Sequence, residues 1–203
     1  TYLRLLFFPY PQNLDYDYPI SETFWEPQTV ASLSLLLALG YSAVLLFRRQ
    51  PLIAFGIFWF FLTLSVESSI FPIEDVIFEH RLYLPLFGFA VSFSSALHLL
   101  LKRMRTFVVC SFSVVLALSV LTYLRNNVWK DEISLWRDVL QKSPRKARPY
   151  ENLGAALLYD GRLKETEELL KGALEKNLRS AEMYNTLGVT VARFGRYEEA
   201  IRY

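Results

Sequence analysis

Hydrophobic positions are unevenly distributed along this chain. Four predominantly apolar stretches occupy its first 124 positions, whereas charged residues at helical spacing dominate after Asn126. A helix needs about 20 residues to cross a bilayer. We therefore expect membrane spans at 29–47, 51–66, 82–101 and 106–124. The second is short, but its aromatic residues leave no polar face. The pattern predicts an all-α fold, with a polytopic membrane domain of about four spans followed by a helical solenoid.

The change in pattern also predicts domain boundaries. Residues 1–27 are expected to form an extracytoplasmic or interfacial loop, and residues 28–124 the transmembrane domain. Residues 125–146 fit a degenerate half-repeat whose Trp136 and Val139 point inward. Residues 147–203 form the repeat region.

An internal repeat identifies the solenoid. Five residues recur with a displacement of 34 positions: Tyr150, Leu153, Gly154, Gly161 and Arg162 return as Tyr184, Leu187, Gly188, Gly195 and Arg196. This period is the tetratricopeptide signature, and it predicts one unit at 147–180 and an incomplete one at 181–203. Because about three units are needed to bury a continuous core, we expect the array to continue past Tyr203.

Basic residues predict the orientation of the spans. Arg48 and Arg49 join the first two spans, and Lys102, Arg103 and Arg105 join the last two. Short loops rich in Lys and Arg stay in the cytoplasm. The chain before the first span, the acidic loop between the two pairs of spans, and the repeats are therefore expected on the extracytoplasmic side.

Composition narrows the function classes. The chain is 53% hydrophobic and 16% aromatic, which favours a membrane protein, and its net charge of +2 provides no basic field for nucleic acid. Its one cysteine, Cys110, excludes an intramolecular disulfide and a thiolate metal cluster. No metal site is predicted.

Thr1 is not an initiator Met and the last residues stop within a helical pattern, so we interpret the chain as an internal fragment.

The strongest candidate site precedes the third span. Glu79, His80 and Arg81 lie just before Pro85, which suits the first turn of a helix. There a guanidinium can bind a phosphate through two parallel N–H bonds, reinforced by the positive end of the helix. Glu79 could hold Arg81 or contact a sugar hydroxyl, and His80 could donate to phosphate or move a proton. The alternative is a structural Glu79–Arg81 pair that secures the loop.

Weaker candidates lie elsewhere in the extracytoplasmic segments. They are Asp15, Asp17, Glu74 and Asp75. Asp15 and Asp17 are two positions apart, so in an extended strand they would point to opposite sides. They could help to bind a polar substrate or orient a cation, or they could simply cap local backbone. A lone His98 inside a span is more often a packing residue than a functional one.

These residues resemble a known family. The chain reads Leu-Phe-Phe-Pro at 6–9, Leu-Asp-Tyr-Asp-Tyr at 14–18 and Glu-His-Arg-Leu-Tyr-Leu-Pro-Leu-Phe-Gly-Phe at 79–89, before the repeats. This arrangement resembles the transmembrane and tetratricopeptide repeat-containing O-mannosyltransferases and their bacterial relatives, which are GT-C-type glycosyltransferases. The resemblance covers the later half of the family's membrane domain and the start of its repeat array.

The resemblance implies transfer of a sugar from a polyprenyl-phosphate donor to an acceptor hydroxyl on the extracytoplasmic side. The family's expected catalytic base lies in an earlier loop outside this chain, so the 203 residues alone are expected to be inactive. Glu79, His80 and Arg81 carry over as donor-site candidates, and Asp15 and Asp17 more weakly. No cofactor is implied with certainty beyond the lipid-linked sugar, which is a substrate.

Two functions therefore compete. In the first, the chain is part of a membrane glycosyltransferase whose repeats bind the acceptor protein or a partner peptide. In the second, it is a non-enzymatic scaffold whose repeats recruit a partner while the spans anchor it in the bilayer. A transporter is a distant third hypothesis, since no span contains paired ionisable residues.

Overall fold

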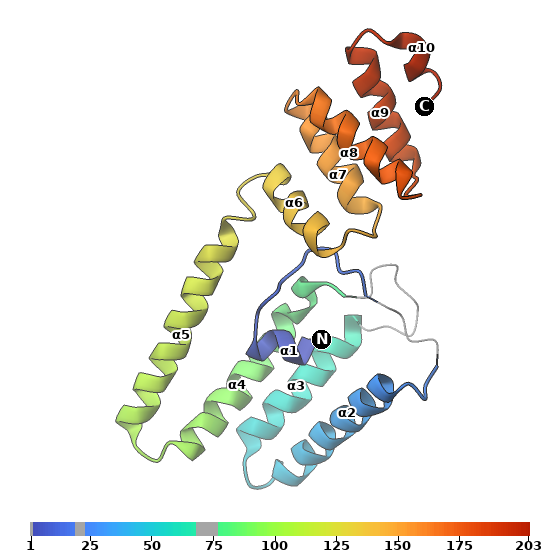
Figure 1. Cartoon of the computed structure of the whole chain (residues 1–203). Helices are drawn as coiled ribbons and strands as arrows, with labels where there is room; N and C mark the ends of the chain where they lie inside the picture. Colours follow the sequence, from blue (N-terminus) through green and yellow to red (C-terminus); the bar gives the residue numbers. More distant parts are fainter. Residues whose placement is uncertain (1, 19–22, 68–76) are drawn as a thin grey trace. The chain divides into compact units, whose positions relative to one another are not determined.

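The computed structural model describes residues 2–18, 23–67 and 77–203, and helices are the only regular elements among them (Figure 1). The chain divides into two compact units. Unit 1 comprises Thr1–Gln12 and Tyr18–Val120, and unit 2 comprises Asn13–Asp17 and Leu121–Tyr203. The sequence had predicted the domain change at 125–130, and it gave no indication that residues 13–17 join the second unit.

Unit 1 contains the apolar helices. These are α2 (Pro27–Leu46), α3 (Pro51–Glu67), α4 (Tyr83–Leu100) and α5 (Met104–Asn126), whose last residues pass into unit 2. Their positions follow the predicted spans closely, and Pro27 and Pro51 begin helices because a first-turn residue needs no N–H donor. Two shorter elements complete the unit, helix α1 (Tyr2–Phe7), which the sequence analysis did not predict, and the 3₁₀ turn η1 (Glu79–Leu82).

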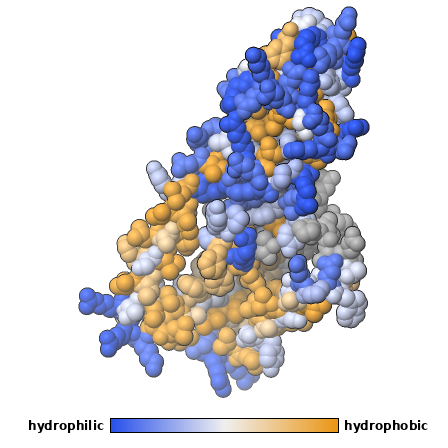
Figure 2. All heavy atoms as spheres, in the orientation of Figure 1, coloured by the Kyte–Doolittle hydropathy of each residue, from blue (hydrophilic) through white to orange (hydrophobic). Residues whose placement is uncertain are grey.

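Three described segments are long and apolar enough to cross a membrane: Pro27–Leu46, Glu79–Leu100 and Met104–Asn126. None of the residues of α5 is buried, and only Ala43 is buried in α2. Figure 2 shows apolar side chains over much of the visible surface of these helices. Such a surface is unfavourable in water and suits lipid. The structure therefore supports a polytopic all-α membrane protein, while α3, with 17 residues, stays a predicted fourth span.

Helices α3 and α4 pack with their backbones in close contact. A Cβ atom built on Gly56 would lie 2.2 Å from the carbonyl oxygen of Gly88, and one built on Gly88 would lie 2.5 Å from that of Gly56. The Ser92 hydroxyl donates a hydrogen bond to the carbonyl of Ile53 at 2.9 Å, and Trp59 Nε1 donates to Leu84 at 3.0 Å. Small residues allow this approach, which is typical of helix pairs in membranes.

Unit 2 contains shorter amphipathic helices. They are α6 (Glu132–Lys142), α7 (Arg148–Tyr159), α8 (Leu163–Glu175), α9 (Ala181–Arg193) and α10 (Tyr197–Ala200). Asp131 caps α6 by accepting from the Ser134 N–H, and Ser180 caps α9 by accepting from the Met183 N–H.

The two predicted repeats form similar helix hairpins. Gly161 and Gly195 occupy the turns with φ of 79° and 78°, a left-handed conformation that glycine adopts without steric cost. After each glycine, an arginine N–H closes the turn onto the preceding helix, from Arg162 to Leu157 at 2.9 Å and from Arg196 to Val191 at 3.2 Å. The 34-residue repeat thus corresponds to a repeated local structure, and its assignment to the tetratricopeptide family stays a prediction.

The core of unit 2 lies between these hairpins. Its buried residues are Tyr150, Leu170, Ala173, Met183, Leu187 and Val191. Gly154 lies against the Leu170 side chain, where an added Cβ would be 2.9 Å from Cδ2. Val139 is fully buried, as predicted, and Trp136 is half-buried. The described residues thus bury the face that the helical periodicity predicted.

Candidate functional site

The first candidate site is the 3₁₀ turn that leads into α4. Glu79, His80 and Arg81 form η1, and the Tyr83 N–H donates to the His80 carbonyl where α4 begins. Glu79 and Arg81 are half-buried, whereas His80 is exposed. Pro85 is buried in the first turn of α4. The structure therefore brings the three leading candidates together at the start of a long apolar helix, the location that the sequence predicted.

Phe78 organises this turn. Its backbone is extended, with φ of −129° and ψ of 134°, and it directly precedes η1. The His80 ring lies 4.9 Å from the Phe78 ring, centroid to centroid, with an interplanar angle of 31°. Cζ of the Arg81 guanidinium lies 5.5 Å from the centroid of the same ring, within cation–π range. One aromatic side chain thus contacts both His80 and Arg81.

Helix α1 supports the same turn. The Phe78 N–H donates a hydrogen bond to the Tyr2 hydroxyl at 3.3 Å. At the other end of α1, the Phe7 ring packs edge-on against Phe89 of α4, with centroids 5.1 Å apart. Ile77, just before Phe78, is buried. The turn is therefore fixed by contacts from a segment more than 70 residues earlier in the chain.

The turn carries side chains of the kind that bind anions. Arg81 and His80 carry N–H donors, and the adjoining N-terminus of α4 has positive backbone polarity. A guanidinium is suited to bind phosphate through two parallel hydrogen bonds. No group of three potential metal ligands occurs among residues 2–18, 23–67 and 77–203.

Glu74 and Asp75 fall outside the described residues, and their role stays a prediction. His98 packs edge-on against the Phe107 ring at 5.2 Å, an arrangement consistent with the expected packing role.

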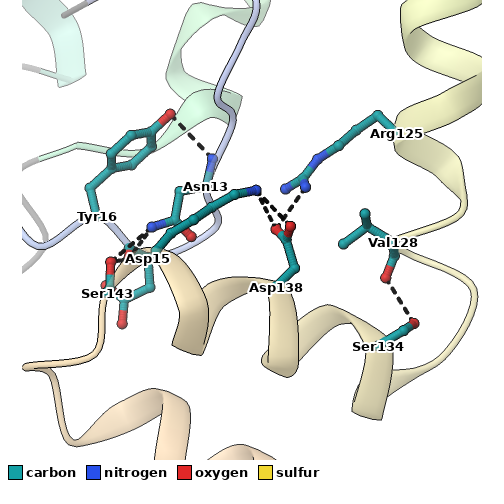
Figure 3. A network of polar contacts seen from close by, with 9 residues as sticks. Asn13, Asp15, Tyr16, Arg125, Val128, Ser134, Asp138 and Ser143 are labelled. Atoms are coloured by element: carbon teal, nitrogen blue, oxygen red, sulfur yellow. Dashed lines mark hydrogen bonds and ion pairs between the residues drawn. The ribbon is translucent and has the colours of Figure 1, made fainter.

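Asp15 and Asp17 belong to a different site, in unit 2. We call residues 13–17 the strap, because this segment, which bends at Leu14 and Asp15, lies across the loop between α6 and α7 (Figure 3). Asp15 is 3% exposed and accepts a hydrogen bond from Lys146 Nζ, with Arg148 Nη1 3.8 Å from its second oxygen. Asp17 accepts from Arg145 Nε at 2.8 Å. Both carboxylates are therefore neutralised by cations of one loop, although they were expected on opposite sides of a strand.

Ser143 is the polar centre of the strap. Its hydroxyl is fully buried, donates to the Asp15 carbonyl at 2.7 Å, and accepts from Asn13 Nδ2 at 2.8 Å and from the Asp17 N–H at 3.1 Å. A serine hydroxyl has one donor and two acceptor positions, so these three bonds use all of them. Sequence reasoning missed this partner. The signal in the sequence was the basic run at 143–148, in which Arg145 and Lys146 closely precede α7 and Arg148 begins it.

A second ionic cluster lies beside the strap in Figure 3. Asp138 of α6 accepts from Arg125 Nη1 at 2.7 Å and from Lys142 Nζ at 2.6 Å. Burial raises the pKa of Asp138, but the hydrogen bonds from Lys142 and Arg125 outweigh it and keep that pKa below its ordinary value. This cluster ties the end of α5 to α6.

Several known proteins have sequences similar to that of this chain. The chain is 35% identical over 112 residues to the Drosophila melanogaster protein O-mannosyl-transferase Tmtc2. This match covers 53% of this chain and 12% of Tmtc2. It is 27% identical over 171 residues to the human protein O-mannosyl-transferase TMTC1, and this match covers 76% of this chain and 19% of TMTC1. The chain is thus similar, at modest identity and over part of its length, to the TMTC protein O-mannosyl-transferases. This confirms the resemblance seen in the sequence.

A third TMTC relative, Drosophila melanogaster Tmtc3, is 26% identical over 160 residues, covering 72% of this chain and 17% of its own length. The chain thus spans less than a fifth of these TMTC relatives. No protein-family model matches the chain. No solved structure matches it either. The TMTC relatives, with the three apolar helices, support an integral membrane protein.

Proposed function

We propose that this chain is part of an integral-membrane glycosyltransferase that moves mannose from a polyprenyl-phosphate donor to a hydroxyl of an acceptor protein. The observation that carries the proposal is the Glu79–Arg81 turn, with its guanidinium and imidazole on the Phe78 ring at the start of α4, in a relative of O-mannosyl-transferases. A lipid-linked phosphate presents its charge at the membrane surface, where such a turn would meet it.

The reaction is a direct displacement. The acceptor oxygen attacks the anomeric carbon of the sugar while a carboxylate outside this chain takes its proton. The bond between that carbon and the phosphate oxygen breaks, and the phosphate leaves with the bonding electrons. Arg81, with His80, stabilises the negative charge that grows on the departing phosphate. Glu79 orients Arg81 or contacts a sugar hydroxyl.

The reaction is placed on the extracytoplasmic side. In unit 1, the turn between α2 and α3 and the turn between α4 and α5 lie at the same end of the helices (Figure 1). Both turns are basic, which favours the cytoplasm for that end. η1 precedes α4, so it lies at the other end of that helix. The helix hairpins of unit 2 follow α5 and would bind the acceptor protein or a partner peptide.

Substitution of Arg81 in the full-length protein tests the proposal. We expect Arg81→Ala to lower transfer from polyprenyl-phosphate mannose by about 100-fold or more, and Arg81→Lys to retain part of it, since lysine keeps the charge without the bidentate geometry. Binding of polyprenyl phosphate alone should weaken in parallel. If the Arg81→Ala variant transfers mannose and binds polyprenyl phosphate as well as the unsubstituted protein does, the proposed site is excluded.

The second candidate is a membrane-anchored scaffold. It is favoured by the exposed aromatic side chains of the hairpins, of which Tyr159 is 94% and Tyr197 68% exposed. Tyrosine at such positions is typical of protein-binding surfaces. A scaffold would keep its partner in Arg81→Ala and lose it in Tyr159→Ala, with no dependence on a lipid-linked sugar in either case.

A further inference from the structure

Phe78 is a residue that the proposed reaction does not itself require. It has no charge and no reactive atom, yet its half-buried ring contacts the two side chains that would bind the donor phosphate. Its carbonyl also accepts the Arg81 N–H at 3.3 Å, which closes the 3₁₀ turn. Phe78 thus contacts Arg81 through both its ring and its backbone.

The ring contact has a geometric consequence for Arg81. A cation over an aromatic ring is attracted by the negative face of the π system. Guanidinium N–H bonds point outward in the plane of the group, and the cation–π attraction to the Phe78 ring acts through the charge of the group and is not itself a hydrogen bond from these donors. An arginine side chain has many rotamers, and a ring that selects one of them reduces the entropy lost when the phosphate binds.

The position of Phe78 is itself fixed from elsewhere in unit 1. The Tyr2 hydroxyl accepts the Phe78 N–H, and α1, which carries Tyr2, is packed on α4 through Phe7 and Phe89. The contacts therefore form a series in which α1 contacts Phe78, and Phe78 contacts the side chains of His80 and Arg81.

We propose that Phe78 is a positioning residue of the donor-phosphate site, with its ring orienting Arg81 and His80 and the Tyr2 hydroxyl fixing its backbone. This inference rests on the proposed function, because it assigns a role at the same site. It adds two residues, Phe78 and Tyr2, that act through Arg81 and do not touch the reacting atoms.

Kinetics of four variants of the full-length protein test it. Phe78→Leu removes the ring and keeps an apolar side chain, and it should raise the KM for polyprenyl-phosphate mannose about tenfold, the equivalent of one cation–π contact in a desolvated site. The KM for the acceptor should not change. Phe78→Tyr retains the ring and should restore the donor KM. Phe61→Leu, which removes a half-buried ring in α3 whose ring contact is with Phe60, is the matched control and should leave the donor KM unchanged.

Tyr2→Phe provides an independent measurement, because it removes one oxygen and leaves the packing of α1 intact. We expect a rise of about threefold in the donor KM, in line with the loss of one neutral hydrogen bond. If Phe78→Leu does not fold, this variant decides alone, and an unchanged donor KM overturns the inference.

The remaining outcomes separate the inference from the proposed function. If Arg81→Ala loses transfer while Phe78→Leu keeps the original donor KM, the role of Phe78 is wrong and the proposed function stands. The same conclusion follows if Phe78→Leu and Phe61→Leu have equal effects. If Arg81→Ala transfers mannose normally, the proposed function is itself wrong.

Discussion

The carboxylate of Asp15 is buried against the ammonium group of Lys146, which lies 131 residues further along the chain. The Lys146 ammonium group also donates to the carbonyl of Tyr16 at 3.3 Å, so one side chain binds the strap at two points. This pair makes five residues near the start of the chain part of the unit that contains the repeats.

Loss of the Asp15 charge should loosen the strap. Asp15→Asn keeps the size of the side chain but removes its charge-assisted hydrogen bond, and it should lower the local free energy of opening by about 1.5–3 kcal/mol. Hydrogen exchange followed by mass spectrometry would detect faster exchange at residues 13–17 and 143–148. Asp17→Asn is the control: its partner Arg145 is 80% exposed, so the effect should be under about 1 kcal/mol. Equal exchange in both variants would contradict the central role of Asp15.

The Asp138 cluster predicts a pH dependence. Because the folded-state pKa of Asp138 is lowered, its ionised form stabilises the fold above the ordinary carboxyl range, and that stabilisation is lost as the pH falls through the folded pKa. Asp138→Asn should therefore be less stable than the unsubstituted protein at pH 7, and the difference should shrink below about pH 4. Thermal unfolding in buffers between these values measures it. Glu168→Gln, an exposed change on α8, should show no such trend.

Close contact between α3 and α4 predicts intolerance of a methyl group. Gly88→Ala would place Cβ against backbone atoms of α3 and should destabilise the helix pair by about 1–3 kcal/mol, as overpacking does. Thermal unfolding in lipid nanodiscs would report a lower midpoint. Gly40→Ala in α2 has nothing within 4 Å of the new Cβ atom and serves as the control, with a midpoint equal to or above the original.

A glycine in a turn and a glycine in a helix predict opposite outcomes for the same substitution by alanine. Gly161→Ala forces a side chain into a left-handed conformation and should cost about 1–2 kcal/mol. Gly172→Ala lies in α8 with open space around its Cβ position, so the better helix former should stabilise the unit by up to about 1 kcal/mol. Chemical denaturation measures both. A stabilising Gly161→Ala would show that its turn differs from the one described.

The proposed orientation predicts which residues a membrane-impermeant thiol reagent reaches. In a Cys110→Ser background, Arg48→Cys and Arg103→Cys should be labelled from the same side, and His80→Cys and Lys164→Cys from the opposite side. All four positions are exposed. Labelling of Arg48→Cys and His80→Cys from one side would refute the orientation and, with it, the donor site.

The helices were the predictable part of the structure. The apolar stretches placed α2 to α5 within about two residues, because lipid imposes length and apolarity on a span. Periodicity predicted the buried Val139, and the glycine spacing predicted the turns at Gly161 and Gly195. Each of these signals is local in the sequence.

The strap and helix α1 were not predictable in the same way. The contact of Asp15 with Lys146 joins residues that no periodic pattern relates, and the six residues of α1 are too few for a helical signal. Phe78 lies between these cases. The sequence shows that Phe78 closely precedes His80 and Arg81. Only the 3₁₀ turn, however, brings its ring into contact with both of these side chains.

The strap changes how a recombinant repeat fragment should be designed. A gene cut between Val120 and Leu121 would encode most of unit 2 without the five residues that use every hydrogen-bonding position of the Ser143 hydroxyl. Fusing residues 13–17 ahead of α6 through a flexible linker, or adding them as a synthetic peptide, would supply the missing piece. A deletion that removes Asn13–Asp17 would therefore alter a unit whose other residues are encoded more than 100 codons downstream.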